Sequence, residues 1–310
     1  MRKCSIAPGK VILLGEHFVV KGKPALGLAV SLYAKVCVVE GNGEVRSRQL
    51  GLVSRDSRHW PLFGALFRAV GEKFGNIPPV DVEVDSEIPL ASGMGSSASV
   101  AVALAHALLS YMNVEFTRED VWRIASEAEK AVHFRPSGVD TTLATHGGFL
   151  YYKQGVFKRL EITLPRSTTI LVVNTRVERS TGEVVRDVLE RYTRLKEVCE
   201  HIYNAAEVLV ERAVEALRVG DVRVIGELML VNHGLLWAMG ASSYVCDKVV
   251  YELVERGALG AKVSGAGRGG VVVGIASSSD AEGIVAWFRK MGYECFTVTP
   301  DYEGVRGISS

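Results

Sequence analysis

The sequence predicts a mixed α and β chain of two domains, and three observations support this. The chain has 310 residues, which is enough for one large or two medium domains. Segments with strand patterns alternate with segments of helical periodicity in both halves of the chain. A mostly polar stretch with a glycine, Lys153 to Arg159, interrupts these patterns, so we expect one domain over 1–160 and another over 161–310.

Composition and charge argue against several classes of protein. Hydrophobic residues make up 48% and charged residues 23% of the chain, as in ordinary globular proteins. The net charge of +1 gives no basic field for nucleic acid or an anionic membrane. The first residues lack the apolar core of a signal peptide, and no apolar run reaches the ~18 residues of a membrane span. We therefore expect a cytoplasmic protein with neither nucleic-acid nor membrane partners.

The cysteines are odd in number and scattered. None forms a Cys-x-x-Cys pair, which argues against zinc and for reduced thiols. We expect each to be a small buried or half-buried residue. The five are Cys4, Cys37, Cys199, Cys246 and Cys295.

The chain begins with two expected strand segments around a turn at Pro8-Gly9. The second, Val11 to Leu14, is continuously apolar and therefore reads as a buried strand. Polar residues bracket it, with Lys10 before it and Glu16 and His17 after it. A buried lysine–glutamate pair would be structural. If a phosphate-binding loop lies in the same domain, Lys10 is instead a candidate cation for a transferring phosphoryl group.

Further strands and one helix are expected before residue 85. Strand patterns cover 28–40 and 80–84, and Gly41-Asn42-Gly43 is a strong turn signal. Residues 44–60 are polar and irregular and predict no element. The apolar residues of Trp60 to Phe74 repeat at helical spacing, so we expect a helix packed on a sheet.

The segment from Pro89 to Ser99 links the strand at 80–84 to a run of good helix formers at 99–109. Its glycines let backbone amides approach a ligand, and a helix start offers unpaired N–H groups at a positive dipole end. No Gly-Lys-Ser/Thr of the Walker type follows, and an ordinary tight turn would also explain the pattern. We interpret the segment as a phosphate cradle in which the Ser97 hydroxyl is a candidate Mg²⁺ ligand.

A helix is expected to begin at Thr117, which with Asp120 resembles a capping box. It ends before a break at 133–140, whose Pro-Ser-Gly-Val-Asp portion is a surface turn or a turn in which Asp140 caps the next segment. A strand pattern follows at Phe149 to Tyr152.

The second half alternates in the same way and contains another glycine-rich loop between two strands, at 260–273. We expect strands at 170–174 and 293–299, and helices at 183–219, 223–236, 244–257 and 281–291.

Three special segments in fixed order, Ala7–His17, Pro89–Ser99 and Val263–Gly270, resemble the GHMP kinases over essentially the whole chain. Within that family the chain looks most like the compact archaeal type of mevalonate kinase. The stretches that discriminate are Pro136–Asp140 with Gly147-Gly148, Asn174–Thr181, Asn232–Leu236 and Gly257–Lys262.

The resemblance implies an α+β fold of two domains. The N-terminal ATP-binding domain would be ribosomal-protein-S5-like with a left-handed βαβ unit, which breaks a general rule and is not readable from sequence pattern. The C-terminal domain would be ferredoxin-like. The implied reaction is ATP-dependent phosphorylation of mevalonate to 5-phosphomevalonate in isoprenoid biosynthesis, with Mg²⁺ as cofactor. The resemblance leaves a homodimer open.

Site roles follow from the resemblance residue by residue. Asp140 would be the catalytic aspartate with Lys10 beside it, and Ser97 and Glu129 would hold Mg²⁺. His17, Thr181, Gly265 and Ala266 would contact the acceptor, and Glu16 would lie close by. The triphosphate would lie on Pro89, Leu90, Ala91, Ser92, Gly93, Met94, Gly95, Ser96, Ser97, Ala98 and Ser99.

Some alternatives stay open at this level. The third segment reads Gly-Ala-Gly-Arg-Gly-Gly, where mevalonate kinases usually have glycine in the fourth place. Arg268 there would reach a phosphate or point to solvent. The adenine pocket is placed only roughly, at 50–65. Rival functions are a GHMP kinase for phosphomevalonate or a sugar, and a nucleotide-binding regulatory protein without catalysis.

Overall fold

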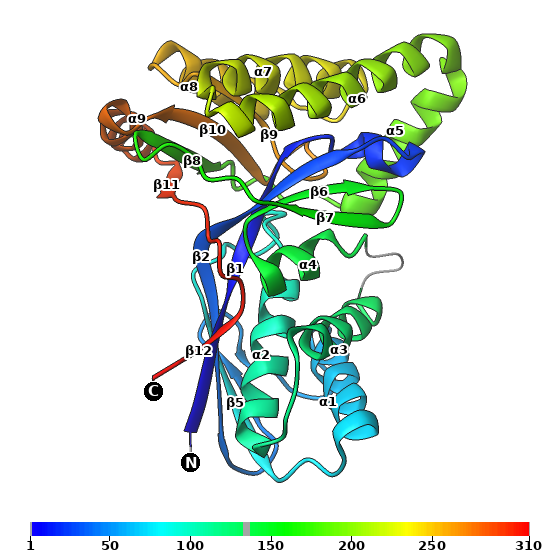
Figure 1. Ribbon diagram of the computed structural model, residues 1–310, viewed down its shortest axis with the longest axis vertical. Coiled ribbons are helices and arrows are strands. Elements are labelled where there is room, and N and C mark those ends of the chain that lie inside the picture. Colours follow the sequence, from blue (N-terminus) through cyan, green and yellow to red (C-terminus); the bar gives the residue numbers. More distant parts are fainter. Residues whose placement is uncertain (1, 133–136, 310) are drawn as a thin grey trace.

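The computed structural model describes residues 2–132 and 137–309 and contains two sheets (Figure 1). The first sheet is mostly antiparallel and includes the path β12-β1-β2-β5-β3-β4, with the β6–β7 hairpin paired to β2. Its strands are β1 (Arg2–Leu14), β2 (Ala25–Glu40), β3 (Val45–Ser47), β4 (Gly51–Leu52), β5 (Val80–Ser86), β6 (Phe149–Lys153), β7 (Val156–Leu160) and β12 (Arg306–Ile308).

The two longest strands, β1 and β2, pair along almost their whole length. The expected turn at Pro8-Gly9 is wrong, because β1 runs straight through these residues and accommodates them by a shift in register against β2. A proline and a glycine together mark a bulge in this case rather than a chain reversal. Lys10 therefore lies inside a long central strand.

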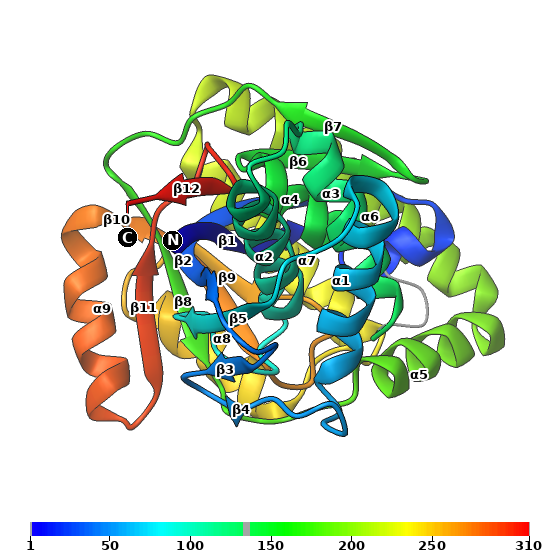
Figure 2. The same cartoon turned by 90° about the horizontal axis from the view of Figure 1, so that it is seen from below.

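Helices α1 (Trp60–Phe74), α2 (Ser96–Met112), α3 (Arg118–Lys130) and α4 (Val139–His146) cover one face of the first sheet (Figure 2). The capping box of α3 is confirmed, since the Thr117 side chain and the Asp120 side chain each accept from the other residue's backbone N–H. The interpretation of Asp140 as a surface-turn or cap residue is wrong. Gly138, with φ 77°, is the N-cap of α4, and Asp140 lies in the first turn of that helix. Residues 133–136 of the expected break lie outside the described part of the chain.

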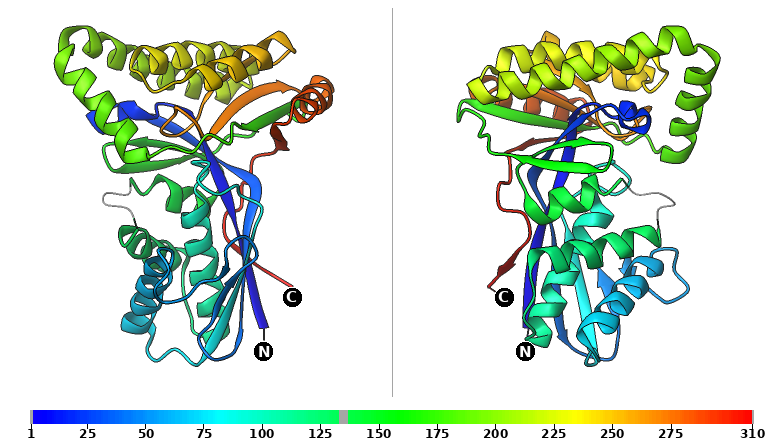
Figure 3. Two further views of the ribbon diagram at one scale, coloured as in Figure 1. Left: turned by 180° about the vertical axis from the view of Figure 1, so that it is seen from behind. Right: turned by 45° about the vertical axis from the view of Figure 1, so that its right-hand side comes forward.

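The second half forms an antiparallel sheet in the order β11-β8-β10-β9. Three helices, α6, α7 and α8, form a layer over it, with α5 at its outer edge (Figure 3). The helix expected over 183–219 is in fact two helices that divide at Leu195. The elements are β8 (Thr168–Asn174), α5 (Thr181–Arg194), α6 (Lys196–Val219), α7 (Val222–Ala238), α8 (Tyr244–Glu255), β9 (Gly260–Val263), β10 (Val271–Ser277), α9 (Ser278–Lys290) and β11 (Glu294–Val298).

The end of the chain returns to the first sheet, which the sequence patterns did not predict. β12 pairs antiparallel with β1, and Figure 1 shows the two chain ends lying near each other. Asp301 anchors this return, since its carboxylate accepts from Tyr33, Arg306 and the backbone of Gly304. The sheets therefore do not follow a single division near residue 160.

A disulfide joins Cys4 to Cys37, so the expectation of five reduced thiols is wrong for this pair. The two residues lie directly opposite each other on β1 and β2. The prediction of reduced thiols rested on the spacing of the cysteines along the chain. That spacing does not reveal which residues of two paired strands lie opposite each other. The remaining three cysteines are buried, as expected. Among the described helices, none has the length and apolar character that a membrane crossing requires.

Candidate active site

A cleft of about 740 Å³ lies between the two halves of the chain. The first half contributes the loop before α2, the start of α2, the end of α3, the start of α4 and the 3₁₀ helix η1 (His17–Lys21). The second half contributes the start of α5 and the glycine-rich loop of the third segment, Val263–Gly270, which we call the third glycine-rich loop. The cleft therefore brings together all three segments that the sequence singled out.

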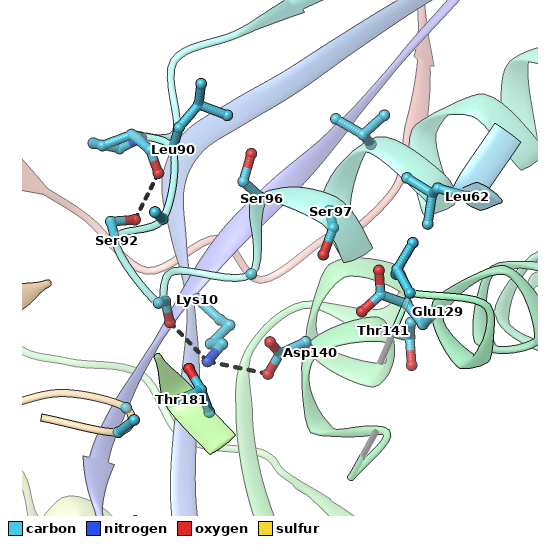
Figure 4. A pocket seen from close by; sticks show the side chains of 18 of the residues that line it. Lys10, Leu62, Leu90, Ser92, Ser96, Ser97, Glu129, Asp140, Thr141 and Thr181 are labelled. Atoms are coloured by element: carbon cyan, nitrogen blue, oxygen red, sulfur yellow. Dashed lines mark hydrogen bonds and ion pairs between the residues drawn. The ribbon is translucent and has the colours of Figure 1, made fainter. Parts of the chain in front are cut away.

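Lys10 and Asp140 form an ion pair inside this cleft. The Lys10 ammonium lies 3.1 Å from Asp140 Oδ1 and donates to the carbonyl of Gly93 at 2.9 Å (Figure 4). The Lys10 side chain is only 8% exposed, whereas the Asp140 side chain is 37% exposed and so remains accessible from the cleft. Gly95, with φ 77°, lies against both, because a Cβ there would be 3.2 Å from Lys10 Cγ and 3.5 Å from Asp140 Oδ2. A glycine suits both the left-handed backbone and this close approach.

One hydrogen bond within the loop before α2, and one from the first turn of α2 to β1, hold this segment. The Ser92 hydroxyl donates to Pro89 O at 2.7 Å, and the Ser99 hydroxyl donates to Pro8 O at 2.7 Å. The side chains of Met94, Ala98 and Ser99 are buried and do not line the cleft, so within the expected cradle they support the loop. The expected cradle residues that do line the cleft are Pro89, Leu90, Ala91, Ser92, Gly93, Gly95, Ser96 and Ser97.

Ser97 and Glu129 face the same part of the cleft. Ser97 is in the first turn of α2, Glu129 is a 4% exposed residue near the end of α3, and Figure 4 shows both beside Asp140. Hydroxyl and carboxylate oxygens are hard ligands of the kind that Mg²⁺ takes, and Mg²⁺ needs few of them from the protein. Within the described residues, no group of three or more His, Cys, Asp or Glu side chains is arranged to hold a metal ion. A magnesium ion at Ser97 and Glu129 would thus rely on substrate oxygens as well.

His17 joins the first half to the third glycine-rich loop. Its Nε2 donates to Ala266 O at 2.7 Å, which leaves Nδ1 as the acceptor. Burial lowers the pKa of His17, and the positive charges of Arg179 and Arg268 act in the same direction. Gly265, Ala266 and Thr181 also line the cleft, and Figure 4 shows Thr181 beside Lys10.

Glu16 makes a different contact from the one the sequence suggested. The buried lysine–glutamate pair does exist, but the lysine is Lys262 and not Lys10. Lys262 is fully buried, and Asn232 Nδ2 donates to the second carboxylate oxygen of Glu16 at 3.1 Å. Burial lowers the pKa of Lys262 while the Glu16 charge opposes that shift. The Glu16 carboxylate is thus bound in the interior, at the wall of the cleft.

Two functional candidates were missed at the sequence level. Arg179 lines the cleft between the cradle and the third loop, where a Cβ on Gly93 would lie 2.6 Å from its Nη2. Lys262 fixes Glu16. Both lie inside quoted motifs, yet neither spacing nor pattern distinguishes them from surface cations. The Arg268 guanidinium bonds Asp187 and the carbonyl of Gly240, so the side chain is held by the protein and does not line the cleft.

Comparisons with known proteins agree with this arrangement. The model of the GHMP kinases N terminal domain matches residues 61–148, and that of the GHMP kinases C terminal matches residues 213–294. The chain is 35% identical to a mevalonate kinase of Aeropyrum pernix, over 97% of this chain and 96% of that one. It is 34% identical to a mevalonate kinase of Archaeoglobus fulgidus, over 97% and 98% of the two chains. The crystal structure of L. major mevalonate kinase in complex with R-mevalonate matches with a TM-score of 0.83 at 30% identity, covering 96% of this chain and 95% of that one.

Proposed function

The chain belongs to the GHMP kinase family, and we propose that it transfers the terminal phosphoryl group of ATP to the 5-hydroxyl of mevalonate. The observation that carries this proposal is the Lys10–Asp140 ion pair, held beside the N-terminus of α2 in a cleft that both halves line. Relatives named mevalonate kinase over nearly the full length of the chain support mevalonate as the acceptor.

In this mechanism the protein positions the reactants and neutralises charge. Backbone amides at the start of α2 and in the loop before it bind the triphosphate, as helix N-termini bind anions. Asp140 accepts the proton of the acceptor hydroxyl while that oxygen attacks the terminal phosphorus and the bond to the bridging oxygen of ADP breaks. Lys10, fixed by Gly93 O and Asp140, stabilises the negative charge that develops on the attacking oxygen and the transferred group.

We further propose that Ser97 and Glu129 hold Mg²⁺ with the nucleotide. When bound, this ion neutralises phosphate charge and orients the terminal phosphate. The support from the chain itself is the donor chemistry, one hydroxyl and one carboxylate facing the cleft beside Asp140.

We propose that the acceptor binds at the other end of the cleft, against the second half of the chain. Arg179 is a cation in the cleft wall and suits the carboxylate of mevalonate. His17 Nδ1, Thr181 and the backbone of Gly265 and Ala266 provide polar contacts around it. Glu16 does not contact the acceptor in this proposal. Its carboxylate is held by Lys262 and Asn232, which fixes the start of the 3₁₀ helix η1 where His17 lies. The lining residues between 50 and 65 remain our prediction for the adenine side, and a homodimer stays a prediction.

The test is ADP release measured across mevalonate, phosphomevalonate, galactose and homoserine as acceptors. We expect mevalonate to give the highest specificity constant. A preference of more than about tenfold, or 1.4 kcal/mol, for another acceptor would show that the family is right and the substrate wrong. ATP binding without ADP release on any of the four acceptors would favour a nucleotide-binding regulatory protein.

A further inference from the structure

Helix α5 begins in the cleft but has little hydrophobic attachment to the rest of the molecule. Its first residue, Thr181, lines the cleft, and Arg179 lies just before it. Only Val184 and Val188 of its 14 residues are buried, and Figure 1 shows the helix at the edge of the helical layer. Hydrophobic burial scales with area, so polar contacts decide much of how firmly this helix is held.

Arg268 supplies such contacts at a point where three segments meet. Its Nη1 lies 2.6 Å from Asp187 Oδ2 on α5, and its Nε donates to Gly240 O at 2.7 Å in the loop between α7 and α8. Its backbone N–H donates to Ala241 O at 3.0 Å. One guanidinium thus connects the third glycine-rich loop, the α7–α8 loop and α5. The hydrogen bond from the Arg268 guanidinium lowers the pKa of the Asp187 carboxyl.

Arg268 does not itself line the cleft, but two of the three segments that it connects, the third glycine-rich loop and α5, do. In the third loop, Gly265 and Ala266 face the cleft, and Ala266 O holds His17. On α5, Asp187 lies six residues after Thr181, which is about 9 Å along a helix. A movement of α5 at Asp187 is therefore transmitted to the end of the helix that enters the cleft.

We propose that Arg268 and Asp187 are positioning residues that fix the start of α5 against the third loop and thereby set affinity for the acceptor. The ATP side of the cleft is built on α2 and the loop before it, which Arg268 does not contact through any hydrogen bond found in the described residues. We therefore expect the larger effect on the acceptor, although Arg179, just before α5, also lies against Gly93 of the cradle. This inference deepens the proposed function and rests on it for the kinetic readout.

The test compares Arg268→Gly and Asp187→Asn with a matched control, Arg176→Gly. Arg268 and Arg176 have φ of 56° and 55°, so each substitution removes an arginine from the same left-handed backbone, which glycine adopts readily. Arg176 is exposed in the segment before α5. The variants should all fold, and a melting curve for each checks this.

We expect Arg268→Gly and Asp187→Asn each to raise the KM for mevalonate about fivefold or more, with the KM for ATP changed less than about twofold. The KM for mevalonate of the double variant should lie within about twofold of that of the more impaired single variant, because the two side chains form one contact. Arg176→Gly should change neither KM. Equal rises in both KM values, or a mevalonate KM no different from that of Arg176→Gly, would overturn the proposal.

Hydrogen–deuterium exchange gives a readout that does not depend on the substrate. Amides of 181–194 should exchange faster in Arg268→Gly than in the wild type or Arg176→Gly, while those of α9 stay unchanged. Unchanged exchange in α5 would show that the Arg268–Asp187 contact does not hold this helix, even if the enzyme is active. If the wild type does not phosphorylate mevalonate, the proposed function fails. The exchange data alone then decide whether Arg268 and Asp187 hold α5 against the third loop.

Discussion

The ammonium group of Lys10, in the middle of strand β1, lies 3.1 Å from Oδ1 of Asp140 in the first turn of α4. The lysine also donates to Gly93 O, so its position is fixed from two sides. A cation held this way stabilises both the aspartate and any negative oxygen that approaches it. The two residues should therefore act on the reaction as one unit.

We predict that Asp140→Asn lowers kcat at least about a hundredfold, since it keeps the shape of the side chain and removes the acceptor of the proton. Lys10→Met should lower kcat as well and also weaken ATP binding. Because both act on one developing charge, the double variant should be little worse than the worse single variant. Steady-state kinetics with mevalonate on the three variants measures this.

Loss of activity alone would not distinguish catalysis from a collapsed cleft. Each variant must melt like the wild type, and Asp140→Asn must retain ATP binding. If Asp140→Asn folds, binds ATP and turns over within about threefold of the wild type, near 0.65 kcal/mol in the barrier, Asp140 is not the catalytic carboxylate.

The metal proposal predicts a graded response at two positions. Ser97→Ala and Glu129→Gln should each raise the Mg²⁺ concentration needed for half-maximal rate, because each removes an oxygen ligand. Glu129→Gln should have the larger effect, since it also removes a negative charge. Titration of the rate with Mg²⁺ at fixed ATP checks this. A magnesium response of Glu129→Gln that matches the wild type would remove Glu129 from the site.

Long periodic segments and motif order made most of the fold predictable. The helix at Trp60–Phe74, the capping box at Thr117 and Asp120, and the buried strand expected at 170–174 and found at 168–174 all follow local rules of periodicity and capping. The three glycine-rich or polar segments also converge on one cleft, as their shared resemblance implied. Local pattern is informative where the element is decided by its own residues.

The errors come from contacts between distant residues. Nothing near Glu16 in the sequence indicates Lys262, and nothing near Cys4 indicates Cys37. Pro8-Gly9 reads as a turn unless one knows that β2 pairs continuously on both sides of it. Local pattern allows Arg268 to be a phosphate contact or a surface arginine, yet two partners from other segments bind its guanidinium.

The buried pair of Lys262 and Glu16 gives a prediction about stability. Lys262→Met leaves the Glu16 carboxylate in the interior without its cation, so we expect the free energy of unfolding to fall by about 3–5 kcal/mol. The double variant Lys262→Met with Glu16→Gln removes both charges and keeps an acceptor for Asn232, and should recover most of that loss. Denaturant unfolding followed by circular dichroism measures both.

An exposed ion pair provides the comparison. The Arg212 and Glu215 side chains are 67% and 63% exposed, so Arg212→Met should change stability by less than about 1 kcal/mol. A similar loss for Arg212→Met and Lys262→Met, or a double variant as unstable as Lys262→Met, would contradict the assignment of a compensated buried pair.

The last prediction concerns stability between pH 7.5 and 5.5. Burial is the first cause of a lowered pKa at five histidines of the described chain, namely His17, His59, His106, His146 and His233. In the unfolded chain the same imidazoles titrate near 6.5, so as pH falls through that value the unfolded state binds protons that the folded state excludes. The contribution of these histidines to the free energy of unfolding is therefore fully present above about pH 6.5, and it is lost as the pH falls below that value.

Each such histidine contributes at most about 1.4 kcal/mol of loss per pH unit, and carboxylates remain largely ionised in this window. His106 offers a single-site test, because its Nδ1 lies 2.8 Å from the Ser5 hydroxyl and a glutamine preserves a polar partner there. His106→Gln should reduce the loss of stability between pH 6.5 and 5.5, whereas His201→Gln, at an exposed position, should not. Unfolding curves at pH 7.5, 6.5 and 5.5 decide this, and stability that stays level or rises on acidification would mean that the folded protein binds these protons.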